Sequence, residues 1–181
     1  QIKECREENA YGEIGDPQHY ADLLWNGQYA YTPRGAKPAG NPAVRYLRLT
    51  SQGGHPGQSA SQSQTRDYYA IAAFQVLHAG DYAIVDSHLV RNETAGDDAV
   101  EVLVHVDALE PVLRETAGSA ASASFDIDLG ALRRGQTIYV AFGPADSAGN
   151  DRFEFDFSLE RSEATRRNER EEPLPDEAQG T

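Results

Sequence analysis

Aromatic residues gather in two short segments of the sequence, where their rings could form a platform for a sugar. Aromatic faces stack on the C–H face of a sugar ring, while Asp, Asn, Gln or Arg side chains bond its hydroxyl groups. The candidate residues for such a glycan site are Trp25, Tyr29, Tyr31 and Tyr68. The first three fall in a segment rich in glycine and proline, which favours exposure. The alternative is that Trp25 plugs one end of the domain and the tyrosines cover its edges, because a tryptophan is usually highly buried.

Oxygen-bearing side chains suited to calcium fall in a short glycine-containing loop. The candidate ligands are Asp146, Asn150 and Asp151, and Asp97 and Asp98 lie in another loop. Calcium takes carboxylate, amide and carbonyl oxygens, but the spacing is not that of an EF-hand. Since Asp and Asn are also good turn formers, the alternative is turn chemistry with no metal. A structural calcium ion therefore remains a hypothesis.

Residue types that serve catalysis are present without a catalytic spacing. The five histidines lie far apart and form no H-x-x-x-H or H-E-x-x-H motif, and no G-x-S-x-G sequence occurs. His105 alternates with valines, and we expect it to be an ordinary, partly exposed histidine. Cys5 has no neighbour that would lower its pKa, which favours an incidental or intermolecular role. No pair stands out among the 29 acidic residues. We therefore predict a protein that is not an enzyme.

The charge balance excludes one large class of partner. Of 181 residues, 16 are Lys or Arg and 29 are Asp or Glu, which gives a net charge of −13. Such a surface repels phosphate backbones, so nucleic acid is not expected as a partner. No run of apolar residues is long enough for a membrane span. The chain starts at Gln1 and contains no methionine, a pattern typical of the mature end left by signal-peptide removal. We expect a secreted, periplasmic or cell-surface protein, the alternative being an arbitrary chain boundary.

The elements that must position these residues are short strands. Apolar and polar residues alternate with period two in residues 67–77, 82–85, 100–106, 125–129, 137–142 and 153–158, and residues 44–50 add a further strand. We predict an all-β fold, an antiparallel β-sandwich of jelly-roll type, with one face of each sheet on the core and the other in water. In residues 153–158 a slip of one residue would bury Glu154 and Asp156, so the register is strongly fixed. Residues 51–66, rich in Gly, Ser and Gln, are expected to be a surface loop.

Three segments are expected along the chain. Residues 1–43 form an irregular N-terminal arm that packs on the sandwich, in which residues 21–25 are a helical turn or a brief strand. Residues 44–159 form the sandwich domain. Residues 160–181 form a charged tail, too polar to fold alone. Residues 160–172 are compatible with a charged helix, and a neighbouring chain would be needed to hold the tail.

Four sequence segments from residue 69 onward resemble those of a family of exported bacterial jelly-roll modules similar to carbohydrate-binding modules. They are residues 69–82 (YAIAAFQVLHAGDY), 96–106 (GDDAVEVLVHV), 125–142 (FDIDLGALRRGQTIYVAF) and 143–159 (GPADSAGNDRFEFDFSL). Upstream, residues 25–31 match the family's aromatic stretch. The chain departs from the family's pattern at Asp98, where a glycine is usual, and at Gln136, where an aspartate is usual. The resemblance implies a non-catalytic sandwich, often a binding accessory beside a polysaccharide-degrading enzyme, and supplies no list of sugar-binding residues.

Two functions therefore remain open. The first is a glycan-binding module at the cell surface or outside it, with Trp25 and the nearby tyrosines as the platform. The second is a structural or accessory subunit of an extracytoplasmic assembly, held to neighbouring protein subunits by its N-terminal arm and its tail. Exposure of Trp25 favours the first, and a buried Trp25 removes the platform.

Overall fold

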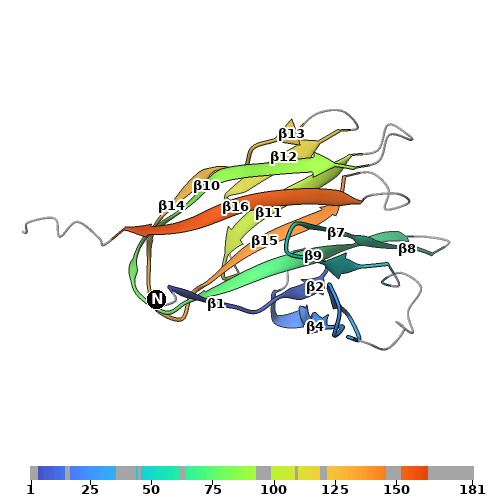
Figure 1. Ribbon diagram of the computed structural model, residues 1–181, viewed down its shortest axis with the longest axis horizontal. Coiled ribbons are helices and arrows are strands. Elements are labelled where there is room, and N and C mark those ends of the chain that lie inside the picture. The colour runs from blue at the N-terminus through green and yellow to red at the C-terminus, as the bar shows by residue number, and fades with distance from the viewer. Residues whose placement is uncertain are drawn as a thin grey trace, which may run out of the picture.

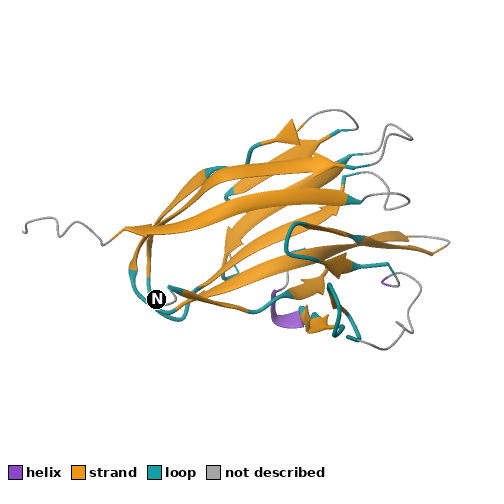
Figure 2. Ribbon diagram, viewed as in Figure 1, coloured by secondary structure: helices purple, strands orange, loops and turns teal. Residues whose placement is uncertain are grey.

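The computed structural model describes residues 4–14, 17–35, 44, 46–61, 64–92, 99–108, 110–118, 122–145 and 152–162. Two antiparallel sheets pack face to face in this part of the chain (Figure 1). Strands make up nearly all of its regular structure, with a short 3₁₀ helix, η1, at Pro17–His19 (Figure 2). The prediction of an all-β antiparallel sandwich is confirmed.

The first sheet, called sheet A, has the strand order β12-β11-β15-β9-β2-β3, and β1 and β8 also pair with β9. The long strand β9 contacts β15 along one edge. On its other edge β2 and β1 pair with successive parts of the strand, and β8 forms a hairpin with its first residues. The strands of sheet A are β1 (Cys5–Glu7), β2 (Ala10–Gly12), β3 (Ala21–Asp22), β8 (Gly57–Ser61), β9 (Gln64–Val76), β11 (Val100–Val106), β12 (Leu113–Ala117) and β15 (Thr137–Pro144).

The second sheet, called sheet B, has the order β13-β10-β16-β7-β6-β5-β4, and β14 also pairs with β10. From β9 onward the chain crosses repeatedly between the sheets, as a jelly roll does. The strands of sheet B are β4 (Leu24–Trp25), β5 (Tyr31–Thr32), β6 (Arg48–Leu49), β7 (Gly53–His55), β10 (Gly80–Arg91), β13 (Ser122–Ala123), β14 (Ile127–Leu132) and β16 (Phe153–Ser162).

The main core lies between the sheets and is built around aromatic rings. Phe142 of sheet A is fully buried and stacks on Phe153 and Phe155 of sheet B, with ring centroids 4.9 and 4.5 Å apart. Glu154 and Asp156 point outward and are exposed. The predicted register of this strand is therefore confirmed, and its physical reason is the cost of burying two carboxylates.

Part of the outer face of sheet A is buried as well, which corrects the expectation that the whole face meets water. Ala10, Tyr69, Ile71, Leu103 and Ala141 form a second cluster there, and Ile14 and Tyr20 of the N-terminal segment pack on it. His105 is 3% exposed and Glu101 is 7% exposed, so the prediction of a partly exposed His105 is wrong. Alternation cannot reveal this, because the cover comes from a segment distant in sequence.

The N-terminal segment contributes strands to both sheets. It runs from β2 and β3 at the edge of sheet A to β4 and β5 at the edge of sheet B, and Leu23 between them is buried in the main core. Residues 21–25 are thus two brief strands, which was one of the two alternatives. The segment closes one open side of the sandwich.

Two other segments differ from their predictions. Residues 51–66 are not a loop, because β7, β8 and the start of β9 lie there. Strands form in this segment because backbone hydrogen bonds to β16, β6 and β9 hold it, without any help from apolar alternation. Residues 160–162 belong to β16 and not to a helix. The remainder of the predicted tail lies outside the described residues.

Candidate functional site

A groove with a volume of about 500 Å³ opens on the outer face of sheet B, and we call it the sheet B groove. Its lining combines one exposed aromatic ring with amide, guanidinium and carboxylate groups. It is lined by Tyr29, Arg48, Thr50, Gln52, Gly53, Gly54, Asn92, Arg152, Phe153 and Glu154. Four separate stretches of the chain therefore meet at one place.

Two glycines make the floor of the sheet B groove. Gly54 lies opposite Phe153, and Gly53 lies opposite the outward-facing Glu154. A Cβ atom on Gly53 would collide with the carbonyl oxygen of Phe153, and one on Gly54 would collide with the carbonyl oxygen of Arg48. Glycine is therefore required at both positions. Gly53 is on the outward-facing side of β7, so its missing side chain leaves the floor of the groove open, whereas Gly54 faces the buried Phe153 and Leu49.

The walls of the groove follow from strand alternation. In residues 46–50, Leu47 and Leu49 point into the core, whereas Arg48 and Thr50 lie on the outer face and are half-buried. Glu154 and Arg152 bracket the buried Phe153 and are exposed on the opposite wall. The alternation thus directs polar side chains into the groove from both sides.

A tight turn holds Tyr29, which lines the sheet B groove. The side-chain oxygen of Asn26 accepts hydrogen bonds from the backbone N–H groups of Gln28, Tyr29 and Ala30, at 2.9, 3.1 and 3.2 Å. Gly27 has φ of 86°, which suits glycine in such a turn. The Tyr29 side chain is 59% exposed. Its ring is therefore available to a ligand while its backbone is held in place.

The four residues predicted to bind glycan do not form one platform. Only Tyr29 lines the sheet B groove. Trp25 is 51% exposed and lies opposite Tyr31 with the ring centroids 5.3 Å apart, and Tyr31 itself is half-buried against the main core. Tyr68 lines a different hollow, beside Tyr11 and His19.

Sequence reasoning missed most of the groove. The sequence did not single out Arg48, Gln52, Asn92 or Arg152 as site residues. Tyr46 was not singled out either; it is exposed with its ring 6.3 Å from that of His55, and it does not line the groove. The alternation of Tyr46, Arg48 and Thr50 with buried leucines is the one signal that could have indicated this wall. The opposite wall comes from distant segments and carries no local signal.

The predicted calcium ligands Asp146, Asn150 and Asp151 lie outside the described residues, as do Asp97 and Asp98. Among the residues that the structure does describe, no group of three or more His, Cys, Asp or Glu side chains is arranged to hold a metal ion. The calcium hypothesis stays a prediction.

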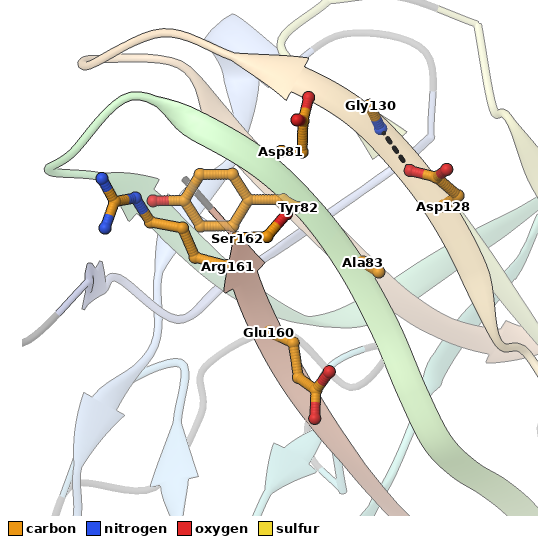
Figure 3. Close-up of a pocket in the computed structure, with 8 residues that line it drawn as sticks. All are labelled: Asp81, Tyr82, Ala83, Asp128, Gly130, Glu160, Arg161 and Ser162. Atoms are coloured by element: carbon orange, nitrogen blue, oxygen red, sulfur yellow. Dashed lines mark hydrogen bonds between the residues drawn. The ribbon is translucent and has the colours of Figure 1, made fainter. Parts of the chain in front are cut away.

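A second open hollow, of about 510 Å³, lies where β10, β14 and β16 meet (Figure 3). It carries the carboxylates of Asp81, Asp128 and Glu160, but its polar groups serve the fold. Asp128 accepts a hydrogen bond from the backbone N–H of Gly130 at 2.8 Å. Arg161 donates to the carbonyl of Ala79 and pairs with Glu4 at 3.2 Å. Tyr82, the aromatic residue of this hollow, is 1% exposed, so it offers no platform.

The buried outer face of sheet A holds a polar network. The hydroxyl of Tyr69 donates to Glu101, and Glu101 lies 3.6 Å from the guanidinium of Arg114. His105 stacks on Tyr139 at 4.7 Å and lies 3.4 Å from the hydroxyl of Tyr20. Burial raises the pKa of Tyr69 and lowers the pKa of His105, so both side chains are neutral near pH 7. The contact of the neutral His105 with Tyr20 ties the N-terminal segment to the sheet.

Cys5 lies in β1 opposite Val76 and is half-buried. Burial raises the pKa of its thiol. A raised pKa makes the thiol less reactive, in line with the absence of an activating neighbour in the sequence.

No protein-family model matches the chain, and no curated protein matches it. In the part of the chain that the structure describes, no helix has the length and apolar character needed to cross a membrane.

Proposed function

We propose that this chain is a non-catalytic β-sandwich module that binds a glycan at the cell surface or outside it, and that the ligand lies in the sheet B groove. One observation carries the proposal: the exposed Tyr29 lines a groove together with glycines and with guanidinium, amide and carboxylate side chains. An aromatic face together with Arg48, Gln52 and Asn92 is the combination that a sugar ring and its hydroxyls require.

In the proposed glycan site, Trp25 has a smaller role than the sequence suggests. Its ring is half-exposed, which keeps a surface aromatic available, but it packs on Tyr31 and does not line the groove. Trp25 therefore offers a matched control, since it is an exposed aromatic residue in the same hairpin as Tyr29 but outside the proposed site.

Affinity electrophoresis against a panel of soluble polysaccharides, followed by calorimetry on any that retard the protein, tests the proposal. We expect at least one polysaccharide to bind, Tyr29→Ala to weaken binding by about tenfold or more, equivalent to about 1.4 kcal/mol, and Trp25→Ala to bind as the wild type does. Absence of binding to every polysaccharide, or equal affinity of Tyr29→Ala and wild type, would contradict the proposal.

A structural subunit is the second candidate, and the edge of sheet B favours it. Within the described residues β4 pairs with β5 alone, and it carries Leu24 and Trp25, both 51% exposed. An open edge strand with apolar side chains can pair with another protein. Light scattering separates the two functions. A monomer near 19.8 kDa that changes mass with a polysaccharide supports glycan binding, whereas a large assembly without any glycan response supports the subunit.

A further inference from the structure

The sheet B groove carries positive charge on a strongly negative protein. The chain has a net charge of −13, yet two arginines, Arg48 and Arg152, line this groove beside one carboxylate, Glu154. The arginines come from opposite walls. Such a local reversal of charge indicates which ligand charge the groove accepts.

Strand register places these arginines in one row. Arg48 lies opposite His55 in β7, and Gly54 lies opposite Phe153. Arg152, which precedes Phe153, therefore comes level with His55 across the antiparallel pair. Since neighbouring strands lie about 4.8 Å apart, the backbones of Arg48 and Arg152 are separated by about 10 Å. The row crosses the groove between its two walls.

Neither guanidinium is engaged by any residue that the structure describes. Four other arginines of the described chain form ion pairs, namely Arg6 with Glu8, Arg66 with Glu13, Arg114 with Glu101 and Arg161 with Glu4. Within the same described part, no side-chain hydrogen bond or ion pair is formed by Arg48, Arg152 or Glu154. Two unengaged guanidinium groups in one groove leave their hydrogen-bond donors for a ligand.

We propose that the sheet B groove selects an anionic glycan, a polysaccharide whose sugars carry carboxylate or sulfate groups. The inference rests on the glycan function proposed above and specifies its ligand class. The guanidinium fork matches the geometry of both anions and binds them through paired, charge-assisted hydrogen bonds. At physiological salt, screening over about 8 Å limits repulsion from acidic groups that lie beyond that distance.

The test compares polysaccharides that differ only in charge. Calorimetry is run in 0.15 M salt with polygalacturonate and with the same polymer after its carboxyl groups have been reduced, and then with dextran sulfate and dextran. We expect the wild type to prefer at least one anionic polymer over its neutral counterpart by tenfold or more. The carboxylate and sulfate arms identify which anion is recognised.

Variants locate the preference. Arg48→Gln/Arg152→Gln should abolish the preference for the anionic polymer. Arg133→Gln/Arg134→Gln, which removes the same charge from an exposed turn outside the groove, should retain it. Thermal melts of both variants confirm that each is folded. If the double variant does not fold, the single variant Arg152→Gln replaces it. We expect this variant to disturb folding less than Arg48→Gln, because the Arg152 side chain is exposed whereas that of Arg48 is half-buried.

The failures are distinguishable. Equal affinity for the charged and neutral polymers, with binding still lost in Tyr29→Ala, overturns the anionic preference but leaves the glycan function standing. Equal loss of preference in the groove and control variants also overturns it, because net charge alone would then be responsible. No binding to any polysaccharide removes the glycan function and the inference with it.

Discussion

Removing one hydroxyl group from the buried face of sheet A should destabilise the whole domain. Tyr69 is 6% exposed and Glu101 is 7% exposed, and the tyrosine hydroxyl donates to the carboxylate. Burial first, and then this hydrogen bond, raises the pKa of Tyr69, so the hydroxyl keeps its proton. Tyr69→Phe retains the ring, which packs against the backbone at Gly143, and removes only the donor. The change therefore isolates one hydrogen bond to a buried charge.

The magnitude follows from the charge of the acceptor. A hydrogen bond to a charged group contributes about 1.5–3 kcal/mol, and the carboxylate left behind is nearly dry. Arg114 compensates little, because its side chain is 62% exposed and lies 3.6 Å from Glu101. At about 2 kcal/mol, and about 2–4 °C per kcal/mol for a chain of this length, Tm should fall by about 4–8 °C.

Urea unfolding followed by circular dichroism measures the change. Tyr29→Phe is the matched control, since its hydroxyl belongs to an exposed side chain and its loss should cost less than about 0.5 kcal/mol. In a cycle with Glu101→Gln, the double variant should lose less stability than the sum of the single variants, by about 0.5–3 kcal/mol. If Tyr69→Phe is no less stable than Tyr29→Phe, the network contributes nothing and the reasoning is refuted.

Two further predictions concern the protonation of His105 and the contacts of Ser87, which lies where the pairing of β10 with β16 shifts register between Val85 and His88. Burial holds the pKa of His105 below its ordinary value, so the unfolded chain takes up a proton below about pH 6.5 that the native state resists. Stability measured by urea unfolding should be full above that pH and fall toward pH 5, and a profile in His105→Gln as steep as that of the wild type would contradict this. Hydrogen bonds from the Ser87 hydroxyl and backbone lower the pKa of Asp126; Ser87→Ala should raise that pKa toward its ordinary value of about 3.9 in an NMR titration. The same variant should lose about 1–3 kcal/mol of stability, because the buried N–H of Phe125, which donates to the Ser87 hydroxyl at 2.7 Å, loses its acceptor; an unchanged free energy of unfolding would count against that contact.

The long strands were predictable because their signal is local. Alternating residues in 153–158 fix which side chains face the core, and the structure has the phenylalanines inside and the acids outside. Strands β7 and β8 were not predictable from alternation, because neither has alternating apolar side chains. Gly53 and Gly54 of β7 are held by pairing with β16 and β6, and β8 is held by pairing with β9. The same limit applies to the outer face of sheet A, where Ile14 and Tyr20, distant in sequence, pack on the buried cluster that contains Leu103.

The candidate site was predictable only in part. The sequence singled out Tyr29 through the aromatic content of its segment, and the structure places Tyr29 at the sheet B groove. Trp25 and Tyr68 came from the same reasoning and lie elsewhere, since aromatic content does not determine the face on which a ring falls. Arg48 and Arg152 meet only through pairing of distant strands, so their juxtaposition has no counterpart in the linear sequence.

The floor of the groove joins parts of the chain that lie far apart in the sequence. Gly53 and Gly54 find their partners in Glu154 and Phe153, so a large loop must close before the groove exists, and contacts of this kind form slowly. A ligand that needs both walls can recognise only a sandwich in which β16 is already in place. Such a ligand would slow unfolding and leave the folding rate unchanged. A higher affinity for the ligand would then give a longer lifetime of the native state.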